Sequence, residues 1–285
     1  MNRIELATTA LRRAIEVRRE AQVPRLNPLN VFDLAMGHLG LRVQFIQGSS
    51  FEGMFAKEQN AIMVPSERPH GRRAFSAAHE LGHWAFGHGS QIDEECSLER
   101  YNDKPEERLV NMFAGYLLML PPAIKSGAEQ LGMDIGSPSY QQAYELACWF
   151  GVGYGTLVNH LRYGVQLLSP EKSMELLTHE PKTIRRHFVP NHATRHLVVA
   201  CNLIPKAPID LAVGDHLLVP LGADLQHSNL STIEKTPLGI LAEAKQSGIS
   251  LINGPNGWAA AVRVMKKDFS GWAKYRHLED DDEND

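Results

Sequence analysis

One stretch, AFSAAHELGHWAFGH at residues 74–88, constrains this chain most, because it sets two histidines and a glutamate into an apolar run. The spacing of the apolar residues predicts a helix. On a helix that advances about 100° per residue, His79 and His83 lie about 40° apart on one face, with Glu80 beside them. Both imidazoles could reach one ion, so HExxH supplies part of a zinc site. The alternative is a packing helix whose partly buried histidines bond to backbone or water.

The third ligand has to come from elsewhere in the chain. The three cysteines are far apart and form no CxxC, so neither a disulfide framework nor a cysteine zinc site is indicated. His88 follows His83 by five residues, whereas a metzincin places its third histidine six residues on. Continued helically, His88 points about 180° away from His79. We therefore expect a carboxylate as the third ligand.

A second apolar helix is predicted for EERLVNMFAGYLLML, which ends at two prolines. Its first turn holds Glu106 and Glu107. Glu107 lies on the apolar stripe of this helix and Glu106 lies mainly off it, so we expect Glu107 to complete a site with His79 and His83. Asn111, one turn on, could hydrogen-bond a ligand or simply join the two helices.

The local patterns along the chain predict an α+β fold. Helices and strand-like alternation fill the first part, and SYQQAYELACWFGVGYGTLVNHLRYGVQLL is typical of two helices around a glycine-rich bend, a helix-turn-helix in outline. From about Phe188 short β-branched runs and turns predict a small β-rich domain. We expect four sections: an α+β unit at 1–125, a helix-turn-helix-like segment at 126–170, a β-rich C-terminal domain at 171–278 and a solvated acidic tail at 279–285.

The charge and hydropathy of the chain argue against two classes of partner. The formal net charge is −4, and the bend-and-helix segment at 151–168 offers phosphates only Arg162 with His160 nearby. We therefore expect no direct DNA binding, and a packing or docking role for this helix, with DNA reading as the alternative. No run approaches the roughly 20 apolar residues of a membrane span, and residues 1–20 lack the apolar core of a signal peptide. A cytoplasmic location is expected, and no oligomeric state is predicted.

The motifs resemble a known family. AAHELGHWAFGH followed by PEERLVNMFAGYLLMLP is similar to the ImmA/IrrE family of zinc metallopeptidases, over about residues 30–125. The departures are Val110 for an alanine before the motif's asparagine and an additional leucine before the prolines, both apolar changes. The resemblance implies a zincin-like domain in which His79, His83 and Glu107 bind Zn²⁺ and Glu80 is the general base.

The resemblance also implies a function. Members of the family cleave a helix-turn-helix repressor of the Xre type and so induce stress-response or mobile-element genes. The alternative is a regulatory or toxin-like protein that engages a partner on a metallopeptidase scaffold without proteolysis. The β-rich end could serve as a scaffold, as a dimerisation surface or as a sensor.

Two further features are left open by the residues. The FEGMFAKEQNAIMVP hairpin could offer its outer strand to an extended substrate, or could be an ordinary part of a sheet. An electrophile for the oxyanion is expected in a peptidase, and His70, Tyr101 and Tyr116 are candidates, although each is typical of a surface or core position as well.

Overall fold

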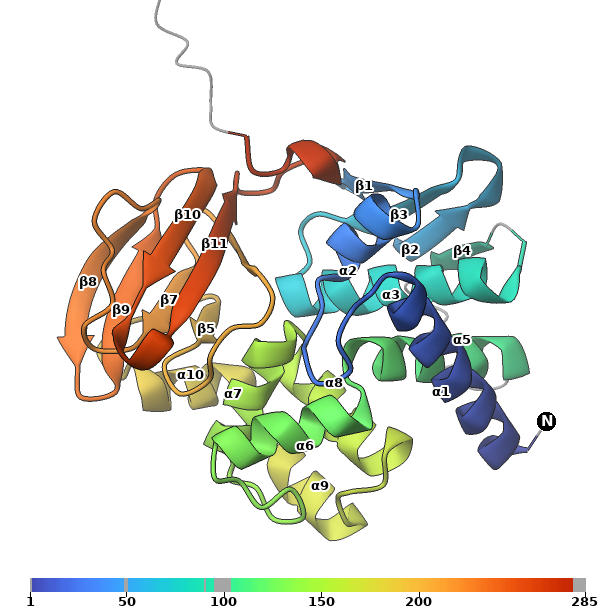
Figure 1. Cartoon of the computed structure of the whole chain (residues 1–285), viewed down its shortest axis with the longest axis horizontal. Helices are drawn as coiled ribbons and strands as arrows, with labels where there is room; N and C mark the ends of the chain where they lie inside the picture. The colour runs from blue at the N-terminus through green and yellow to red at the C-terminus, as the bar shows by residue number, and fades with distance from the viewer. Residues whose placement is uncertain (1, 49–50, 90, 95–103, 279–285) are drawn as a thin grey trace, which may run out of the picture.

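The computed structural model describes residues 2–48, 51–89, 91–94 and 104–278 (Figure 1). The helices are α1 (Arg3–Glu20), α2 (Val31–Asp33), α3 (His70–Phe86), α5 (Pro105–Leu118), α6 (Pro121–Gln130), α7 (Tyr140–Phe150), α8 (Tyr154–Asn159), α9 (Pro170–Leu177) and α10 (Pro181–Phe188). The strands are β1 (Arg42–Ile46), β2 (Phe51–Ala56), β3 (Ala61–Pro65), β4 (Gln91–Glu94), β5 (Leu197–Val199), β6 (Ile209–Ala212), β7 (His216–Val219), β8 (Leu230–Thr236), β9 (Gly239–Ala244), β10 (Gly248–Asn253), β11 (Ala259–Met265) and β12 (Gly271–Trp272). The predicted α+β class and the β-rich C-terminal part are confirmed. The acidic tail at 279–285 lies outside the described residues.

The first sheet has the strand order β12-β1-β3-β2-β4. β3 runs parallel to β1, with Ile62 opposite Val43, and antiparallel to β2, where Ile62 is opposite Phe55. β4 pairs antiparallel with β2 and covers its outer side. Both strands of the hairpin are therefore paired on both sides, so of the two alternatives left open for the hairpin, the structure shows an ordinary part of a sheet. The edge on this side of the sheet is β4.

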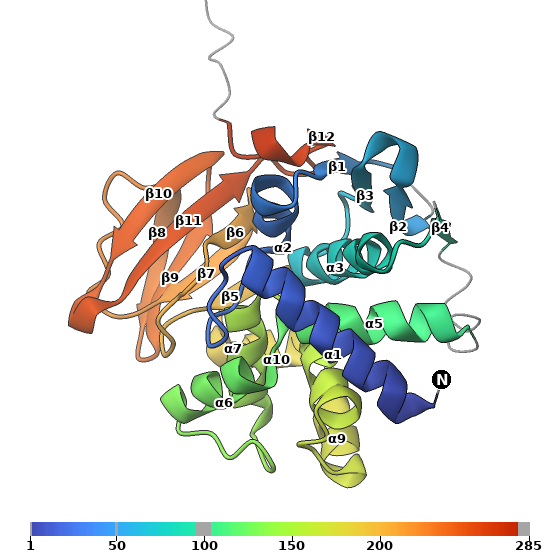
Figure 2. The ribbon, with the colours of Figure 1, turned by 45° about the vertical axis from the view of Figure 1, so that its right-hand side comes forward.

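Two long helices carry the residues of interest and lie against each other beneath this sheet (Figure 2). α3 packs on β2 and β3 with one side and on α5 with another, and α1 crosses α5. The fully buried Arg18 of α1 ties these helices together, because its guanidinium donates to Leu117 O at 2.7 Å and to Pro24 O at 3.0 Å. Burial lowers the pKa of Arg18 to about 10, so the side chain still carries its charge at neutral pH.

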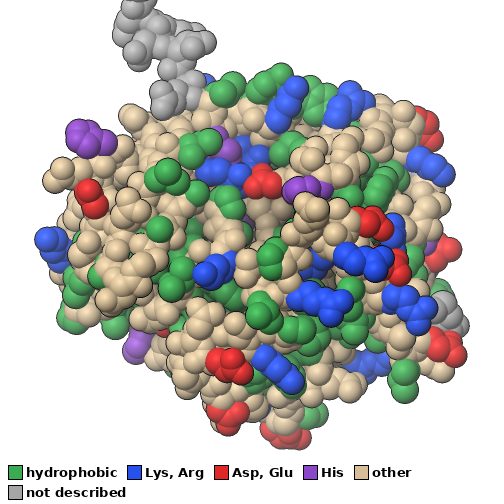
Figure 3. Space-filling view, viewed as in Figure 1, with side chains coloured by type: hydrophobic (Ala, Val, Ile, Leu, Met, Phe, Trp, Pro, Cys, Tyr) green, Lys and Arg blue, Asp and Glu red, His purple; other side chains and the backbone are tan. Residues whose placement is uncertain are grey.

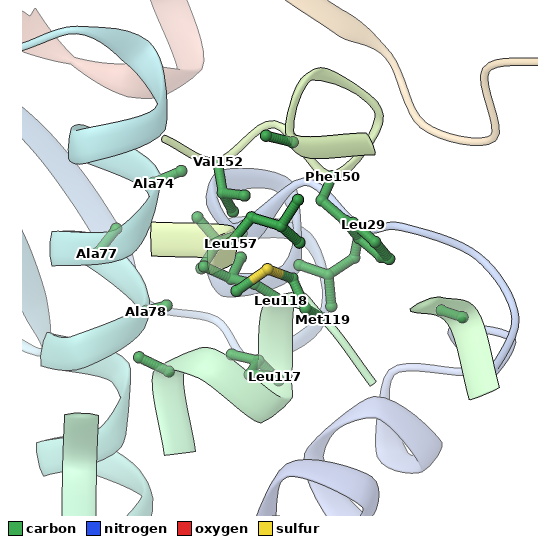
Figure 4. Packing of buried hydrophobic residues seen from close by; sticks show 14 of the residues in the cluster. Leu29, Ala74, Ala77, Ala78, Leu117, Leu118, Met119, Phe150, Val152 and Leu157 are labelled. Carbon is green, nitrogen blue, oxygen red and sulfur yellow. The ribbon is translucent and has the colours of Figure 1, made fainter. Parts of the chain in front are cut away.

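The predicted helix-turn-helix-like segment forms α7 and α8. α7 ends at Gly151, whose φ of 65° is the left-handed conformation that favours glycine at a helix end. α8 continues as a π-helical turn at His160–Gly164 and packs against α5. Figure 4 shows Ala74, Ala77 and Ala78 of α3 facing Val152, Leu157 and the Leu117 end of α5. This segment is thus joined to the α3 and α5 pair by one continuous apolar core.

Two further helices precede the β-rich part. Residues 170–188 contain α9 and α10, which are not among the predicted elements, and the strands begin at Leu197, after the change of pattern expected at about Phe188. Pro170 and Pro181 stand in the first turns of the two helices, where proline is tolerated because the first N–H groups have no helical partner. Strands β10-β11-β6 and β5-β7-β9-β8 form two sheets that enclose a second apolar core.

A buried charged junction joins the β-rich part to the start of the chain. Asp210 of β6 accepts from Arg263 of β11 at 2.6 Å, from Arg276 at 3.2 Å and from Asn30 at 2.8 Å. Both arginines also reach Asp33 of α2, at 2.8 and 3.2 Å. Burial by itself raises the pKa of Asp210, but the charges of Arg276 and Arg263 outweigh it and hold the pKa well below its usual value. In Figure 3 acidic, basic and histidine side chains gather beside a hollow between the β sheets and α2.

The chain then returns to the first sheet. β12 pairs antiparallel with β1, with Trp272 opposite Gln44, and Ser270 donates a hydrogen bond to Phe45 O at 3.2 Å. The first sheet therefore draws on residues far outside the 1–125 unit that the sequence predicts, and the division into domains stays a prediction. No helix among the described residues is long and apolar enough to cross a membrane.

Candidate metal centre

The HELGH residues lie in the middle of α3, as the apolar spacing predicts. The helix begins after Pro69 and ends at Gly87, whose φ of 71° lets its N–H and that of the next residue close the last turn. His79 and His83 are one turn apart and both are buried, with His83 fully so. The apolar residues around them fix the helix against the sheet, so the two imidazoles are held by packing.

Glu107 comes from the first turn of α5, as predicted, and is 1% exposed, while Glu106 is exposed to solvent. Pro105 at the helix start and the two acidic residues suit a helix N-terminus, where the dipole favours negative charge. α5 reaches the histidines because it approaches α3 closely at Gly82. A Cβ at that position would lie 2.9 Å from the Cβ of Val110 and 3.1 Å from Phe113.

The three side chains converge on one point. His79 Nε2 lies 3.2 Å from His83 Nε2 and 3.3 Å from Glu107 Oε2, and His83 Nε2 lies 3.7 Å from the same oxygen. Among the described residues these three side chains form the group that could hold a metal ion. Ligand atoms bound about 2.0–2.2 Å from a tetrahedral zinc ion lie about 3.3–3.6 Å apart. The observed separations fit such an ion.

Hydrogen bonds on the outer side of each imidazole support this assignment. His79 Nδ1 lies 2.9 Å from Asn111 Oδ1, which can only accept, so Nδ1 carries the proton and the Nε2 of the neutral ring carries a lone pair. His83 Nδ1 lies 3.0 Å from His88 Nδ1. Such outer contacts fix the orientation and tautomer of metal-binding histidines. The lone pair of His79 Nε2 then faces the carboxylate oxygen of Glu107, an arrangement that a cation stabilises.

Glu107 is a carboxylate at neutral pH. Burial by itself would raise the pKa of Glu107, but when the imidazoles of His79 and His83 are protonated and no cation is bound, their hydrogen bonds and charges outweigh burial and lower the pKa to about 2. The group is therefore ionised and can bind a cation over the whole physiological pH range.

Glu80, the predicted general base, lies beside the cluster under strand β2. Its side chain is 1% exposed, and a Cβ at residue 53 would lie 2.6 Å from its Oε1. Gly53 therefore leaves the space that the Glu80 carboxylate occupies. The backbone of β2 is thus one wall of the site, and β2 shifts its register against β4 at this same point, between Phe51 and Gly53.

The two candidate electrophiles that the structure describes, His70 and Tyr116, do not join the cluster. Tyr116 donates its hydroxyl proton to Gly164 O at 2.8 Å and packs edge-on against His160. His70 contacts Phe32 at the start of α3, and burial lowers its pKa to about 3. Tyr101 lies outside the described residues.

The sequence reasoning missed two residues of the site. His88 was set aside as a ligand, and the structure places it as the partner of His83 beyond the helix end. Its signal was its position just after Gly87, where the chain turns back on the helix. Gly53 carried no signal beyond being a glycine inside a strand pattern, which often marks a bulge or a close backbone approach.

Replacing Gly82 with alanine is expected to destabilise the protein by about 1–3 kcal/mol, because the added methyl group pushes α5 away from α3. Metal affinity should fall with it, since Glu107 moves with α5. Urea unfolding and zinc titration measure both effects. The control is Gly155→Ala in α8, where a Cβ meets no atom within 4 Å. Equal stability of the two variants would contradict the close approach.

Replacing Gly53 with alanine is expected to leave metal content and melting temperature nearly unchanged, because the added methyl displaces only the end of the Glu80 side chain. Activity should fall about 10- to 100-fold, since a shift of about 1 Å in a catalytic group has costs of that size. Steady-state kinetics beside metal analysis check this. If this variant has the kcat/KM of the wild type, the position of the Glu80 carboxylate beneath Gly53 is not required for activity.

In this site two helices bring two histidines and a glutamate together, and a second glutamate follows the first histidine. This arrangement defines the class of HExxH metallopeptidases. Comparison with known families agrees: residues 36–162 match the IrrE N-terminal-like domain of the peptidase M78 family. This part of the chain belongs to the ImmA/IrrE family and has a zincin-like fold. The match contains α3 and α5 and excludes α1 and the strands from β5 onward.

The other comparisons add less. A comparison with curated proteins found no match. Among solved structures, a Mycobacterium tuberculosis transcriptional regulator is similar over 55% of this chain and 47% of its own length, with 19% identity and a TM-score of 0.35. The chain thus spans about half the length of that protein.

Proposed function

We propose that this protein is a zinc-dependent endopeptidase that cleaves a helix-turn-helix repressor of the Xre type. The observation that carries the proposal is the convergence of His79 Nε2, His83 Nε2 and Glu107 Oε2 next to the buried Glu80. This donor set, with two histidines and one carboxylate, suits zinc and leaves a position for water.

The roles of the side chains follow from their chemistry. His79, His83 and Glu107 would hold a zinc ion, which would supply Lewis acidity to polarise a carbonyl and to lower the pKa of a water. Glu80 takes the proton of the attacking water and later gives it to the leaving amine. Asn111 and His88 hold the two imidazoles so that their Nε2 atoms face Glu107. The backbone of β2 at Gly53 keeps the Glu80 carboxylate beside the site.

The substrate class is supported by the family resemblance, because members of the family act on repressors of this type. The competing possibility is a protein that binds such a partner without cutting it. The intact HExxH motif favours cleavage, since a protein that only binds has no need of a general base.

The test is incubation of the purified, zinc-loaded chain with purified helix-turn-helix repressors of the Xre type. Cleavage that a chelator stops, and that added zinc restores, supports the proposal. Mass spectrometry of the fragments identifies the bond. A stable complex without fragments, under the same conditions, would instead establish the protein that only binds.

A further inference from the structure

A cleft with a volume of about 690 Å³ lies beside the metal centre, between α1, α5 and the end of α8. We call it the basic cleft. Its lining includes Arg3, Phe75, Arg108, Asn111, Asn159 and Tyr163. A volume of this size falls within the range of sites that bind small ligands, and a short peptide segment fits it.

The basic cleft lies next to the candidate metal centre, on the Nδ1 side of His79. Asn111 lines the cleft and is also the residue that holds His79 Nδ1 at 2.9 Å. Phe75 lines the cleft from α3, one helical turn before His79, which is a rise of about 6 Å. Because an extended chain covers about 3.3 Å per residue, a rise of this size corresponds to about two residues of an extended peptide.

The charge of the cleft is positive. Arg3 and Arg108 stand on walls made by different helices, and no Asp or Glu is among its described lining residues. No carboxylate of the described chain lies within ion-pair distance of either arginine. His160, which also lines the cleft, is buried with Nε2 3.0 Å from Met119 O, and burial lowers its pKa to about 4, so it is neutral. Two positive charges therefore face the cleft, and the described part of its lining holds no acidic side chain.

The arginines are also placed to hold a carboxylate. Arg3 is fixed by a hydrogen bond of 2.8 Å from Nη2 to Tyr163 O and lies over the Tyr163 ring. Arg108 is half-buried on α5, one helical turn before the cleft residue Met112. Guanidinium groups bind carboxylates with parallel hydrogen bonds, which gives direction as well as charge.

We propose that the basic cleft binds an acidic segment of the polypeptide substrate, with Arg108 as its main contact and Arg3 as the second. The identification of this segment as part of a substrate rests on the proposed peptidase function. The preference for carboxylates rests on the cleft alone. The protein would thus select bonds that lie a few residues from an Asp or Glu.

The test measures peptide binding by fluorescence anisotropy, with the full chain carrying Glu80→Gln so that nothing is cut. The probes are fluorescein-labelled peptides of three Ala-Glu repeats and of three Ala-Gln repeats. The Glu peptide should bind about ten-fold more tightly than the Gln peptide, and Arg108→Gln should remove most of this difference. Arg3→Gln should remove a smaller part. Arg12→Gln, an exposed arginine on the outer side of α1, is the matched control and should change nothing.

A charge reversal keeps the test independent of folding defects. Arg108→Glu, with an unchanged melting temperature, should bind a peptide of three Ala-Lys repeats in preference to the Glu peptide. Equal binding of the Glu and Gln peptides would overturn the proposal. So would an equal loss in Arg12→Gln, or tighter binding of a single-stranded DNA hexamer, because either indicates general attraction of anions.

The two proposals fail in different ways. The binding experiment needs neither metal nor cleavage. If the Glu80→Gln variant prefers the Glu peptide but the wild type cleaves no repressor, the peptidase proposal is refuted and the cleft remains as a docking site. Chelator-sensitive cleavage with no preference for acidic residues would refute the cleft and leave the peptidase.

Discussion

The Glu80→Gln variant is expected to bind as much zinc as the wild type and to cleave its substrate about 10²- to 10⁴-fold more slowly. Glutamine has nearly the same shape as glutamate, so the buried position beneath Gly53 remains filled and the three proposed ligands stay in place. The amide cannot accept the proton of the attacking water, so the loss falls on kcat. Single-turnover cleavage of the repressor, with metal analysis of the same sample, measures both quantities.

The matched control is Glu106→Gln on α5. It removes the same charge close to the site, but its side chain is exposed and lies outside the cluster. It should cleave within about two-fold of the wild type, as is usual for surface substitutions. Cleavage at the wild-type rate by the Glu80 variant would place the general base elsewhere.

His83→Ala and Glu107→Ala are each expected to abolish zinc binding at micromolar zinc concentrations. Each variant keeps only two of the three protein ligands that a catalytic zinc site normally has. The wild type should contain about one zinc per chain by plasma mass spectrometry. Saturating zinc at 100 to 1,000 times its Kd should also stabilise the wild type by about 2.7–4.1 kcal/mol, and this gain should be absent from both variants.

His88→Ala tests whether His88 only orients the proposed ligand His83 and does not bind the metal itself. Loss of the contact to His83 Nδ1 should weaken zinc binding about 10- to 100-fold, so this variant still fills at high zinc concentration. If the wild type takes up no metal when zinc is supplied, the HELGH helix is a packing helix. The peptidase proposal should then be abandoned in favour of a protein that only binds its partner.

The residues of the candidate site could be predicted from the sequence because their signals are local. HELGH and Glu107 each sit in a long apolar helix whose period identifies the buried face, and burial of Glu107 but not Glu106 agrees with that period. The packing of these two helices against each other was inferred from chemistry, because a zinc ion bound by two histidines needs a third protein ligand. The contact of His79 with Asn111 was one of two alternatives, and in the structure it joins the helices and also orients an imidazole.

The rest depended on contacts between distant segments, which leave little local pattern. β12 has two residues, too few to show a period, and it pairs with a strand more than two hundred residues earlier. The covering of β2 by β4 likewise depends on where the chain returns after α3. α9 and α10 are different: Ser169 with Pro170, and Pro181, are helix-start signals that were present in the sequence and were overlooked.

The place of β12 in the first sheet bears on how the molecule is made. More than two hundred residues separate β1 from β12 along the chain, so the sheet beside the candidate metal centre stays one strand short until both segments have been synthesised. The ion pairs from Asp33 to Arg263 and Arg276 likewise join segments that are far apart in the chain. A nascent chain that has not reached residue 272 therefore carries HELGH and Glu107 without the finished frame around them.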